Sequence, residues 1–293
     1  MSRTGQIPTV KKIVYDPLTR MLIGISVVVG SVALGLWLTS ILPASNPELK
    51  RAFETVVSIT MALASYILLF KFYEKRRITE LSLSSLGNDA LTGFSTGFIL
   101  QSMIVVVLYV ANCYTVLVVN HVSVILPTFF AALTAGFVAE IILRGLFFRL
   151  AEEKLGTTVT LIISGLCFAI LHAGSKGASI FSITSTAIQA GILPAAAYVY
   201  TRRLWMPVFL HFAWDLAEPG IYGGINPGIS EEGTLLSSRI SGPEILTGGL
   251  TGPGSSIQSI VLCAAVSILF LTLAIRDKKW ITPFWRNRNY ASG

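Results

Sequence analysis

Charged side chains are scarce in this chain. Only 13% of its 293 residues are Asp, Glu, Lys or Arg, whereas 53% are hydrophobic. Soluble domains carry about 25% charged residues, so this composition cannot supply the polar surface of a soluble fold of this length. Several apolar stretches also reach the ~20 residues with which a helix crosses a bilayer. The sequence therefore predicts an integral membrane protein.

Cysteine and the common metal motifs are also scarce. The three cysteines, Cys113, Cys167 and Cys263, lie in or near apolar segments and form no Cys-x-x-Cys pair, which predicts small core residues rather than a zinc or redox site. No His-Glu-x-x-His sequence occurs, which excludes the zincin arrangement. No internal repeat supports an inverted-repeat transporter.

The net charge of +7 does not indicate nucleic-acid binding, because the basic residues gather where apolar segments end. The clearest groups are Lys11, Lys12 and Arg20 before the first segment and Arg276, Lys278 and Lys279 after the last. Such asymmetry orients membrane proteins with their basic ends in the cytoplasm. We expect a multi-pass protein of the prokaryotic plasma membrane with both termini cytoplasmic and with membrane lipids, not nucleic acid, as partners.

The hydrophobic pattern predicts an all-α polytopic fold of about eight transmembrane helices, forming a single integral membrane domain over residues 1–293. The expected segments are 21–42, 53–72, 91–119, 123–150, 157–175, 178–201, 204–222 and 256–275. The longest interruption, the Gly- and Pro-rich loop 219–255, is expected on the non-cytoplasmic side. Loops of this length act as lids or as passive connections, and both alternatives stay open.

Three polar fragments with i,i+4 spacing interrupt the apolar segments. They are Glu140-x-x-x-Arg144, Phe168-x-x-x-His172 and His211-x-x-x-Asp215. Each alone has a structural explanation, as a buried ion pair, an interfacial histidine or a local helix pair. Together they bring ionisable groups into membrane-length runs, where such groups usually face a protein cavity and carry function. We therefore expect a polar intramembrane cavity.

Two chemistries fit such a cluster. A carboxylate can activate water as a general base while imidazoles stabilise the oxyanion that develops on a peptide carbonyl. Alternatively, Glu140, His172, His211 and Asp215 could hold a divalent metal that supplies hydroxide. A third use, proton relay in a coupled transporter, draws on the same residues.

The ordered fragments resemble the motifs of the CAAX-processing and bacteriocin-processing membrane endopeptidases (the CPBP or Abi family, including the Rce1-type proteases). The resemblance covers about residues 123–222, the motif core. It implies a membrane-embedded endopeptidase that hydrolyses a peptide bond in a peptide or a membrane-associated protein. It settles neither metal dependence nor oligomeric state.

The resemblance also implies a role for each residue. The family has paired glutamates followed by x-x-x-Arg, which correspond here to Ala139, Glu140 and Arg144. The first glutamate is the water-activating base, the second an orienting partner, and the motif histidines, here His172 and His211, assist or stabilise the oxyanion. Asp215 stands where the family has Asn or Asp.

Ala139 therefore occupies the position of the general base, and its methyl group cannot accept a proton. Three explanations are open: a substitution made to trap an inactive enzyme, which we favour; a natural pseudoprotease; or a variant in which Glu140 serves as the base. We expect this chain to be a catalytically inactive form. The rival functions are a non-catalytic membrane scaffold or immunity protein of the same fold and a proton-coupled transporter.

The depths of the three fragments conflict if every segment is a straight rod. Glu140 and His211 then lie in the cytoplasmic half of the membrane and His172 in the outer half. A single site therefore requires at least one helix to tilt or break.

Overall fold

The computed structural model describes residues 16–43, 46–174, 177–223 and 233–287. Six helical runs in these residues are long and apolar enough to cross a membrane. The expectation of an all-α polytopic membrane protein is therefore confirmed.

The chain passes through long helices joined by short turns and by several π-helical turns. In order they are α2 (Pro17–Ser40), α3 (Pro47–Leu68) with the π-helical turn Leu69–Glu74, α4 (Leu86–Val110), α5 (Leu126–Glu140) with the π-helical turn Ile141–Phe148, α6 (Arg149–Ala173), α7 (Ile180–Thr186), the π-helical turn Ala187–Ile192, α8 (Leu193–Thr201), α9 (Trp205–Asp215) with the π-helical turn Leu216–Ile221, α10 (Glu244–Thr247), α11 (Ile257–Arg276) and α12 (Phe284–Asn287).

The eight expected segments and the six membrane-length runs differ for two reasons. The expected segments 123–150 and 157–175 belong to one helical run, Val122–Ala173, in which the chain turns at Gly156 (φ 75°, ψ 167°). The helical path Trp205–Ile221 follows the expected segment 204–222 but falls short of membrane length. Each expected segment thus contains a helix, although only six helical runs of the described residues are long and apolar enough to be counted as membrane spans.

The expectation for residues 91–119 is wrong in its C-terminal part. Helix α4 ends at Val110, Asn112 takes a left-handed conformation (φ 57°), and the chain continues as strand β1 (Tyr114–Val119). Strand β1 pairs antiparallel with β2 (Leu236–Ile240), which lies in the loop 219–255. The β-branched run Val116–Val119 is apolar in either conformation, so hydropathy could not separate the strand from a continuing helix.

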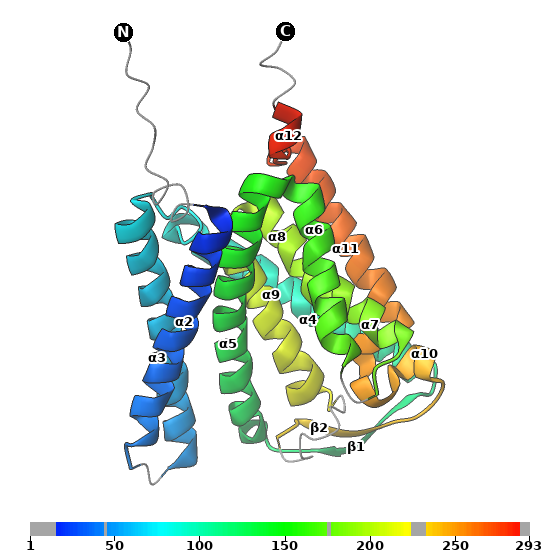
Figure 1. Ribbon diagram of the computed structural model, residues 1–293. Helices are drawn as coiled ribbons and strands as arrows, with labels where there is room; N and C mark the ends of the chain where they lie inside the picture. Colours follow the sequence, from blue (N-terminus) through cyan, green and yellow to red (C-terminus); the bar gives the residue numbers. More distant parts are fainter. Residues whose placement is uncertain (1–15, 44–45, 175–176, 224–232, 288–293) are drawn as a thin grey trace, which may run out of the picture.

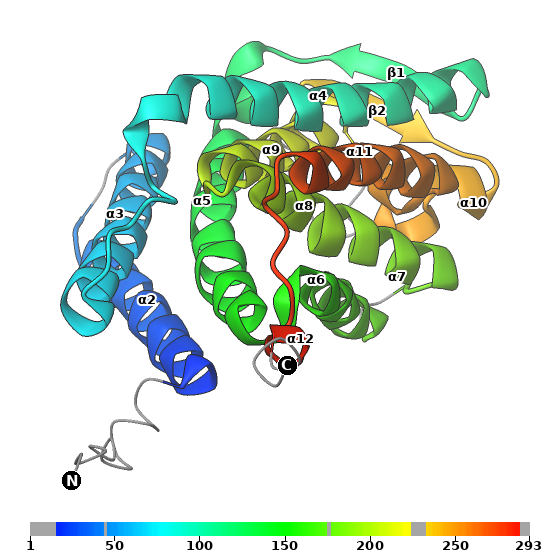
Figure 2. The same cartoon turned by 90° about the horizontal axis from the view of Figure 1, so that it is seen from above.

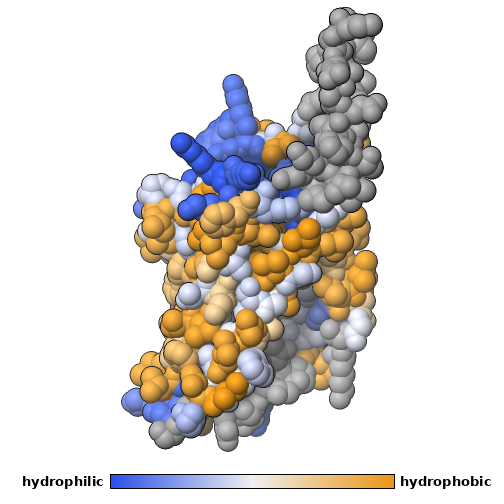
Figure 3. Space-filling view, turned by 60° about the vertical axis from the view of Figure 1, so that its left-hand side comes forward, coloured by the Kyte–Doolittle hydropathy of each residue, from blue (hydrophilic) through white to orange (hydrophobic). Residues whose placement is uncertain are grey.

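The helices form a bundle with its described ends on one side. The start of α2 and helix α12 lie at the same end, opposite the β1–β2 ribbon (Figure 1). Helices α2 and α3 lie beside each other at one edge, and α4 runs along α9 and α11 (Figure 2). Apolar side chains cover the flank below a hydrophilic end (Figure 3). This distribution suits a bilayer around the flank.

Helix α9 is held between α4 and α5 by direct contact of main chains. A Cβ atom at Gly93, Gly97 or Gly136 would lie 2.3–2.8 Å from a carbonyl oxygen of α9, which is closer than real Cβ contacts. Small residues permit such close approach in membrane bundles. These contacts fix the position of α9, which carries the third polar fragment.

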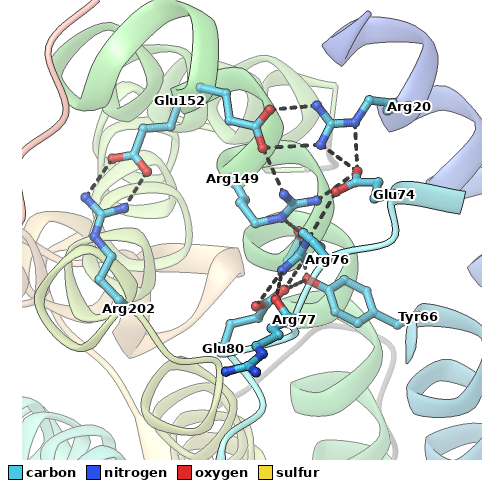
Figure 4. Close-up of polar contacts among 11 residues, drawn as sticks. Arg20, Tyr66, Glu74, Arg76, Arg77, Glu80, Arg149, Glu152 and Arg202 are labelled. Atoms are coloured by element: carbon cyan, nitrogen blue, oxygen red, sulfur yellow. Dashed lines mark hydrogen bonds and ion pairs between the residues drawn. The ribbon is translucent and has the colours of Figure 1, made fainter. Parts of the chain in front are cut away.

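An ionic cluster ties the N-terminal helices to the bundle (Figure 4). The guanidinium of Arg20 on α2 lies 2.6 Å from Glu74 and 2.7 Å from Glu153. Arg149 contacts the same two carboxylates, at 3.4 and 2.9 Å. The cluster thus joins α2, the end of α3 and the start of α6 at the hydrophilic end.

Candidate active site

Glu140 and Arg144 form a fully buried pair, 0% and 1% exposed. Arg144 Nη1 donates to Glu140 Oε1 over 2.9 Å, and Nη2 donates to the carbonyl oxygens of Ala190 and Gly191. The guanidinium carbon lies 5.6 Å from the ring centroid of Phe168. A buried guanidinium needs a charged partner and several acceptors, and Arg144 has both. The first polar fragment and the aromatic residue of the second therefore meet.

His211 joins the third fragment to the first. Its Nδ1 lies 2.8 Å from Glu140 Oε1, and its Nε2 lies 3.2 Å from Asp215 Oδ2. A neutral imidazole carries one N–H, so both contacts are hydrogen bonds only when the ring is protonated. The chain Arg144, Glu140, His211, Asp215 then alternates in charge. Its charges balance within the apolar bundle.

A cavity of about 1190 Å³ lies beside this chain of contacts, bounded by α2, α3, α5, α6, the turn Ala187–Ile192 and the end of α9. Of the expected site residues, Ala139, His172 and Asp215 line it. Glu140, 0% exposed, is withdrawn from solvent beside Ala139. The structure therefore separates the two adjacent positions, with 139 at the cavity and 140 behind its wall.

His172 reaches the cavity from α6 rather than joining the chain of contacts. Its Nε2 atom is buried, and among the described residues it has no hydrogen-bond partner. The structure thus brings Glu140, Arg144, His211 and Asp215 into one contact network and places His172 on the cavity that Ala139 and Asp215 also line.

Glu218 is a cavity residue that the motif analysis missed. Its Oε1 accepts a hydrogen bond from the Gly254 main-chain N–H over 2.7 Å, and its Oε2 accepts one from the Gln101 amide over 2.6 Å. The sequence did contain a signal, since His211, Asp215 and Glu218 follow i, i+4, i+7 spacing and so share one helical face.

The described part of the loop 219–255 packs against the cavity. Thr251 and Ser255 line it, and Gly254 is held between Glu218 and the Ser185 hydroxyl, which donates to the Gly254 carbonyl over 2.5 Å. Residues 224–232 of this loop lie outside the described residues. The loop is therefore a wall of the cavity, and whether it also opens as a lid stays a prediction.

Metal binding is the alternative use of the same donors. Over residues 16–43, 46–174, 177–223 and 233–287, no three His, Cys, Asp or Glu side chains converge as ligands. Both nitrogens of His211 already face carboxylates, and Glu140 Oε1 already accepts from Arg144.

Comparison with known families bears on this geometry. Residues 120–217 match the family model of the Rce1-like type II CAAX prenyl endopeptidases. The Rce1-like segment contains every expected site residue from Ala139 to Asp215, and its match indicates a CAAX-type intramembrane protease fold. No curated protein and no solved structure matches the chain.

Proposed function

We propose that the chain is an intramembrane endopeptidase of CAAX type in which Ala139 stands at the position of the general base. One observation carries the proposal: Ala139 lines the cavity of about 1190 Å³, whereas the neighbouring Glu140 is 0% exposed. The substrate is a peptide or a membrane-associated protein segment bound in that cavity. With alanine at position 139, the chain binds this substrate without hydrolysing it at an appreciable rate.

Glu140 is poorly suited to replace the missing base. A base must come within about 2.6–3.2 Å of the water proton that it removes. Glu140 Oε1 is engaged by both Arg144 and His211. Its Oε2 has no partner among the described residues, but the side chain has no exposed surface at which water could reach it. In this proposal Glu140 orients His211 and neutralises Arg144.

A glutamate at position 139 would bring a carboxylate to the cavity wall. It would take a proton from water as the hydroxyl oxygen attacks the peptide carbonyl, and would return that proton to the leaving amine. His172 Nε2, buried without a partner among the described residues, would donate to the oxyanion. His211 would act as a positioning residue, because both of its nitrogens are engaged by carboxylates. No step of this scheme passes through a metal.

The test is the variant Ala139→Glu in proteoliposomes with a farnesylated CAAX peptide as substrate. General-base catalysis contributes roughly 10²–10⁴-fold, so we expect cleavage at least 100-fold above that of the unaltered chain. Ala139→Gln is the matched control, since it adds nearly the same volume without a base. Equal cleavage by the Glu and Gln variants, or by the unaltered chain, contradicts the proposal.

The methyl group of Ala139 also favours a second candidate, a non-catalytic scaffold or immunity protein with the same fold. Such a protein keeps its biological effect after His172→Ala, whereas a protease restored by Ala139→Glu loses its cleavage with that change.

A further inference from the structure

Among the described residues, seven buried side-chain polar atoms lack a hydrogen-bond partner. Three of them belong to side chains that line the cavity: Ser58 Oγ, His172 Nε2 and Gln189 Oε1. They come from α3, α6 and the π-helical turn Ala187–Ile192. Buried polar groups almost always have a hydrogen-bond partner, so three exceptions around one cavity call for a ligand that satisfies them.

Ser58 departs from the habit of the other helical hydroxyls. A serine inside a helix usually bonds to a carbonyl of the preceding turn. Ser65, farther along α3, does so with the Ala62 carbonyl over 3.1 Å. Ser58 is 0% exposed, and within the described chain its hydroxyl bonds to no such carbonyl. Its hydroxyl therefore remains available to a molecule in the cavity.

Gln189 is held in place by its neighbours. The carbonyls of Ala190 and Gly191 accept hydrogen bonds from Arg144, and Ser164 donates to Gly191 over 2.8 Å. These contacts fix the turn Ala187–Ile192, and π-helical turns often occur at functional sites. The carboxamide of Gln189 thus lines the cavity as a combined donor and acceptor.

Acidic side chains outnumber basic ones on the cavity wall, where Arg51 brings one positive charge and Glu54, Asp215 and Glu218 bring three carboxylates. The unpartnered atoms of Ser58 and Gln189 are uncharged and need hydrogen-bond partners rather than a countercharge. An isoprenoid chain has no polar group with which to satisfy Ser58 or Gln189. A peptide main chain offers one N–H and one C=O at almost every residue, and both kinds of partner are needed here.

We propose that Ser58 and Gln189 bind the main chain of a peptide segment in the cavity that His172 also lines. The inference rests on the proposed function in one respect, that the ligand is a peptide. It adds that recognition uses the peptide backbone and that two residues outside the three polar fragments supply it.

The test measures peptide binding rather than cleavage. The unaltered chain can be used for it, because a protein without the general base does not consume the peptide during the titration. A fluorescent farnesylated CAAX peptide is titrated into the full chain in nanodiscs. Loss of one hydrogen bond weakens binding roughly twofold to tenfold, and we expect this range for Ser58→Ala and for Gln189→Leu. Ser65→Ala and Gln258→Leu are matched controls, since neither side chain lines the cavity; Ser65 bonds to Ala62 and Gln258 donates to the Leu246 carbonyl. Both controls should bind the peptide as the unaltered chain does.

Two further probes separate backbone recognition from general damage. Farnesyl-cysteine lacks the peptide main chain, and a peptide with N-methylated amides keeps its carbonyl oxygens but lacks the N–H groups from which Gln189 Oε1 would accept. We expect both variants to bind farnesyl-cysteine as the unaltered chain does, and Gln189→Leu to bind the N-methylated peptide as the unaltered chain does. Ser58→Ala should also unfold at the same or a higher temperature, because it removes a buried hydroxyl that has no partner in the free protein.

Several outcomes overturn the inference: no binding of the peptide to the unaltered chain, unchanged peptide binding by both variants, or equal weakening for farnesyl-cysteine. Its failure is distinguishable from failure of the protease proposal. If Ala139→Glu does not cleave while both variants still weaken peptide binding, the peptide site stands and the protease function falls. If Ala139→Glu cleaves while Ser58→Ala and Gln189→Leu bind the peptide normally, the protease function stands and the peptide site falls.

Discussion

Glu140 shares one carboxylate oxygen between the guanidinium of Arg144, which is 1% exposed, and the imidazole of His211, which is partly exposed. Breaking a buried ion pair by removing one partner typically destabilises by about 3–5 kcal/mol, since the remaining charge stays buried without compensation. At the residue scale, Glu140 therefore matters for folding before it matters for chemistry.

We expect Glu140→Ala to lower the free energy of unfolding by about 3–5 kcal/mol, because it leaves the buried Arg144 guanidinium without its carboxylate partner, whereas His211 keeps Asp215. Asp215→Ala is the comparison, since the Asp215 side chain is 37% exposed and exposed pairs contribute about 0–1 kcal/mol. Unfolding by a denaturing detergent in mixed micelles measures both. Equal losses for the two variants would show that burial of Glu140 is not the cause.

The sequence could predict contacts within a fragment but not between fragments. Spacing of i,i+4 predicted that Glu140 meets Arg144 and that His211 meets Asp215, and both contacts are present. The contact of Glu140 with His211 depends on how α5 packs against α9, which no local spacing encodes. The use of Phe168 as a surface for Arg144 depends in the same way on α6.

At the scale of single helices, the packing of α4 and α5 against α9 depends on glycines. Gly93-x-x-x-Gly97 is a small-residue pattern of the kind that brings membrane helices together, and a Cβ at Gly97 would lie 2.4 Å from the Leu210 carbonyl oxygen. Leu210 precedes His211, so displacement of α9 there would also displace the imidazole from Glu140.

We expect Gly97→Ala to destabilise the protein by about 1–3 kcal/mol, the usual range for overpacking. Gly87, near the start of the same helix, has no atom within 4 Å of an added Cβ. Gly87→Ala should therefore be neutral or stabilising by up to about 1 kcal/mol, because alanine restricts the unfolded chain. Thermal unfolding of both variants in detergent measures the difference. A neutral Gly97→Ala would contradict the close packing of α4 on α9.

Hydropathy predicts the positions of the helices well, but it does not distinguish strand β1 from a helix. The expected segments 178–201 and 256–275 match the helical stretches 180–201 and 257–276 closely. The strand β1 was assigned to a helix because Val116, Leu117, Val118 and Val119 are apolar in any conformation. The turn at Gly156 (φ 75°) lies between the expected segments 123–150 and 157–175, so the sequence predicted this change of direction correctly.

The ionic cluster at the hydrophilic end couples the stability of the whole molecule to acid. Burial alone would raise the pKa of Glu80, but hydrogen bonds from Arg76 and Tyr66 and the Arg76 charge outweigh it and hold the pKa below its ordinary 4.5. A depressed pKa stabilises the folded state above the unfolded value. That contribution is lost as the pH falls below 4.5 through the folded value.

We expect the unfolding temperature of the unaltered chain to fall more steeply between pH 5 and pH 3 than that of Glu80→Gln, which has no carboxylate to protonate at this position. At pH 7 Glu80→Gln should unfold at a lower temperature than the unaltered chain, because the variant has no ion pair with Arg76. Parallel pH profiles for the two proteins would show that Glu80 does not contribute to acid sensitivity.

The orientation of the whole molecule follows from its two ends. The end that carries the start of α2 and helix α12 lies opposite the β1–β2 ribbon (Figure 1). Arg76 belongs to the first of these ends, because it pairs with Glu74, which also pairs with Arg20 near the start of α2. Basic residues near membrane segments favour the cytoplasm. We therefore expect the hydrophilic end of Figure 3 to be cytoplasmic and the ribbon to lie on the other side.

Thr79→Cys and Ser241→Cys place one exposed thiol at each end, in a chain whose native cysteines are replaced by alanine. A membrane-impermeant maleimide applied to intact cells should label the thiol at position 241, and should reach position 79 only after the membrane is permeabilised. The reverse pattern would place the ribbon, and not the hydrophilic end, in the cytoplasm. Labelling of both positions in intact cells would contradict an arrangement in which the bundle separates them. Because the loop 219–255 forms a wall of the cavity on the ribbon side, this orientation also decides from which side of the membrane that wall can be reached by a substrate.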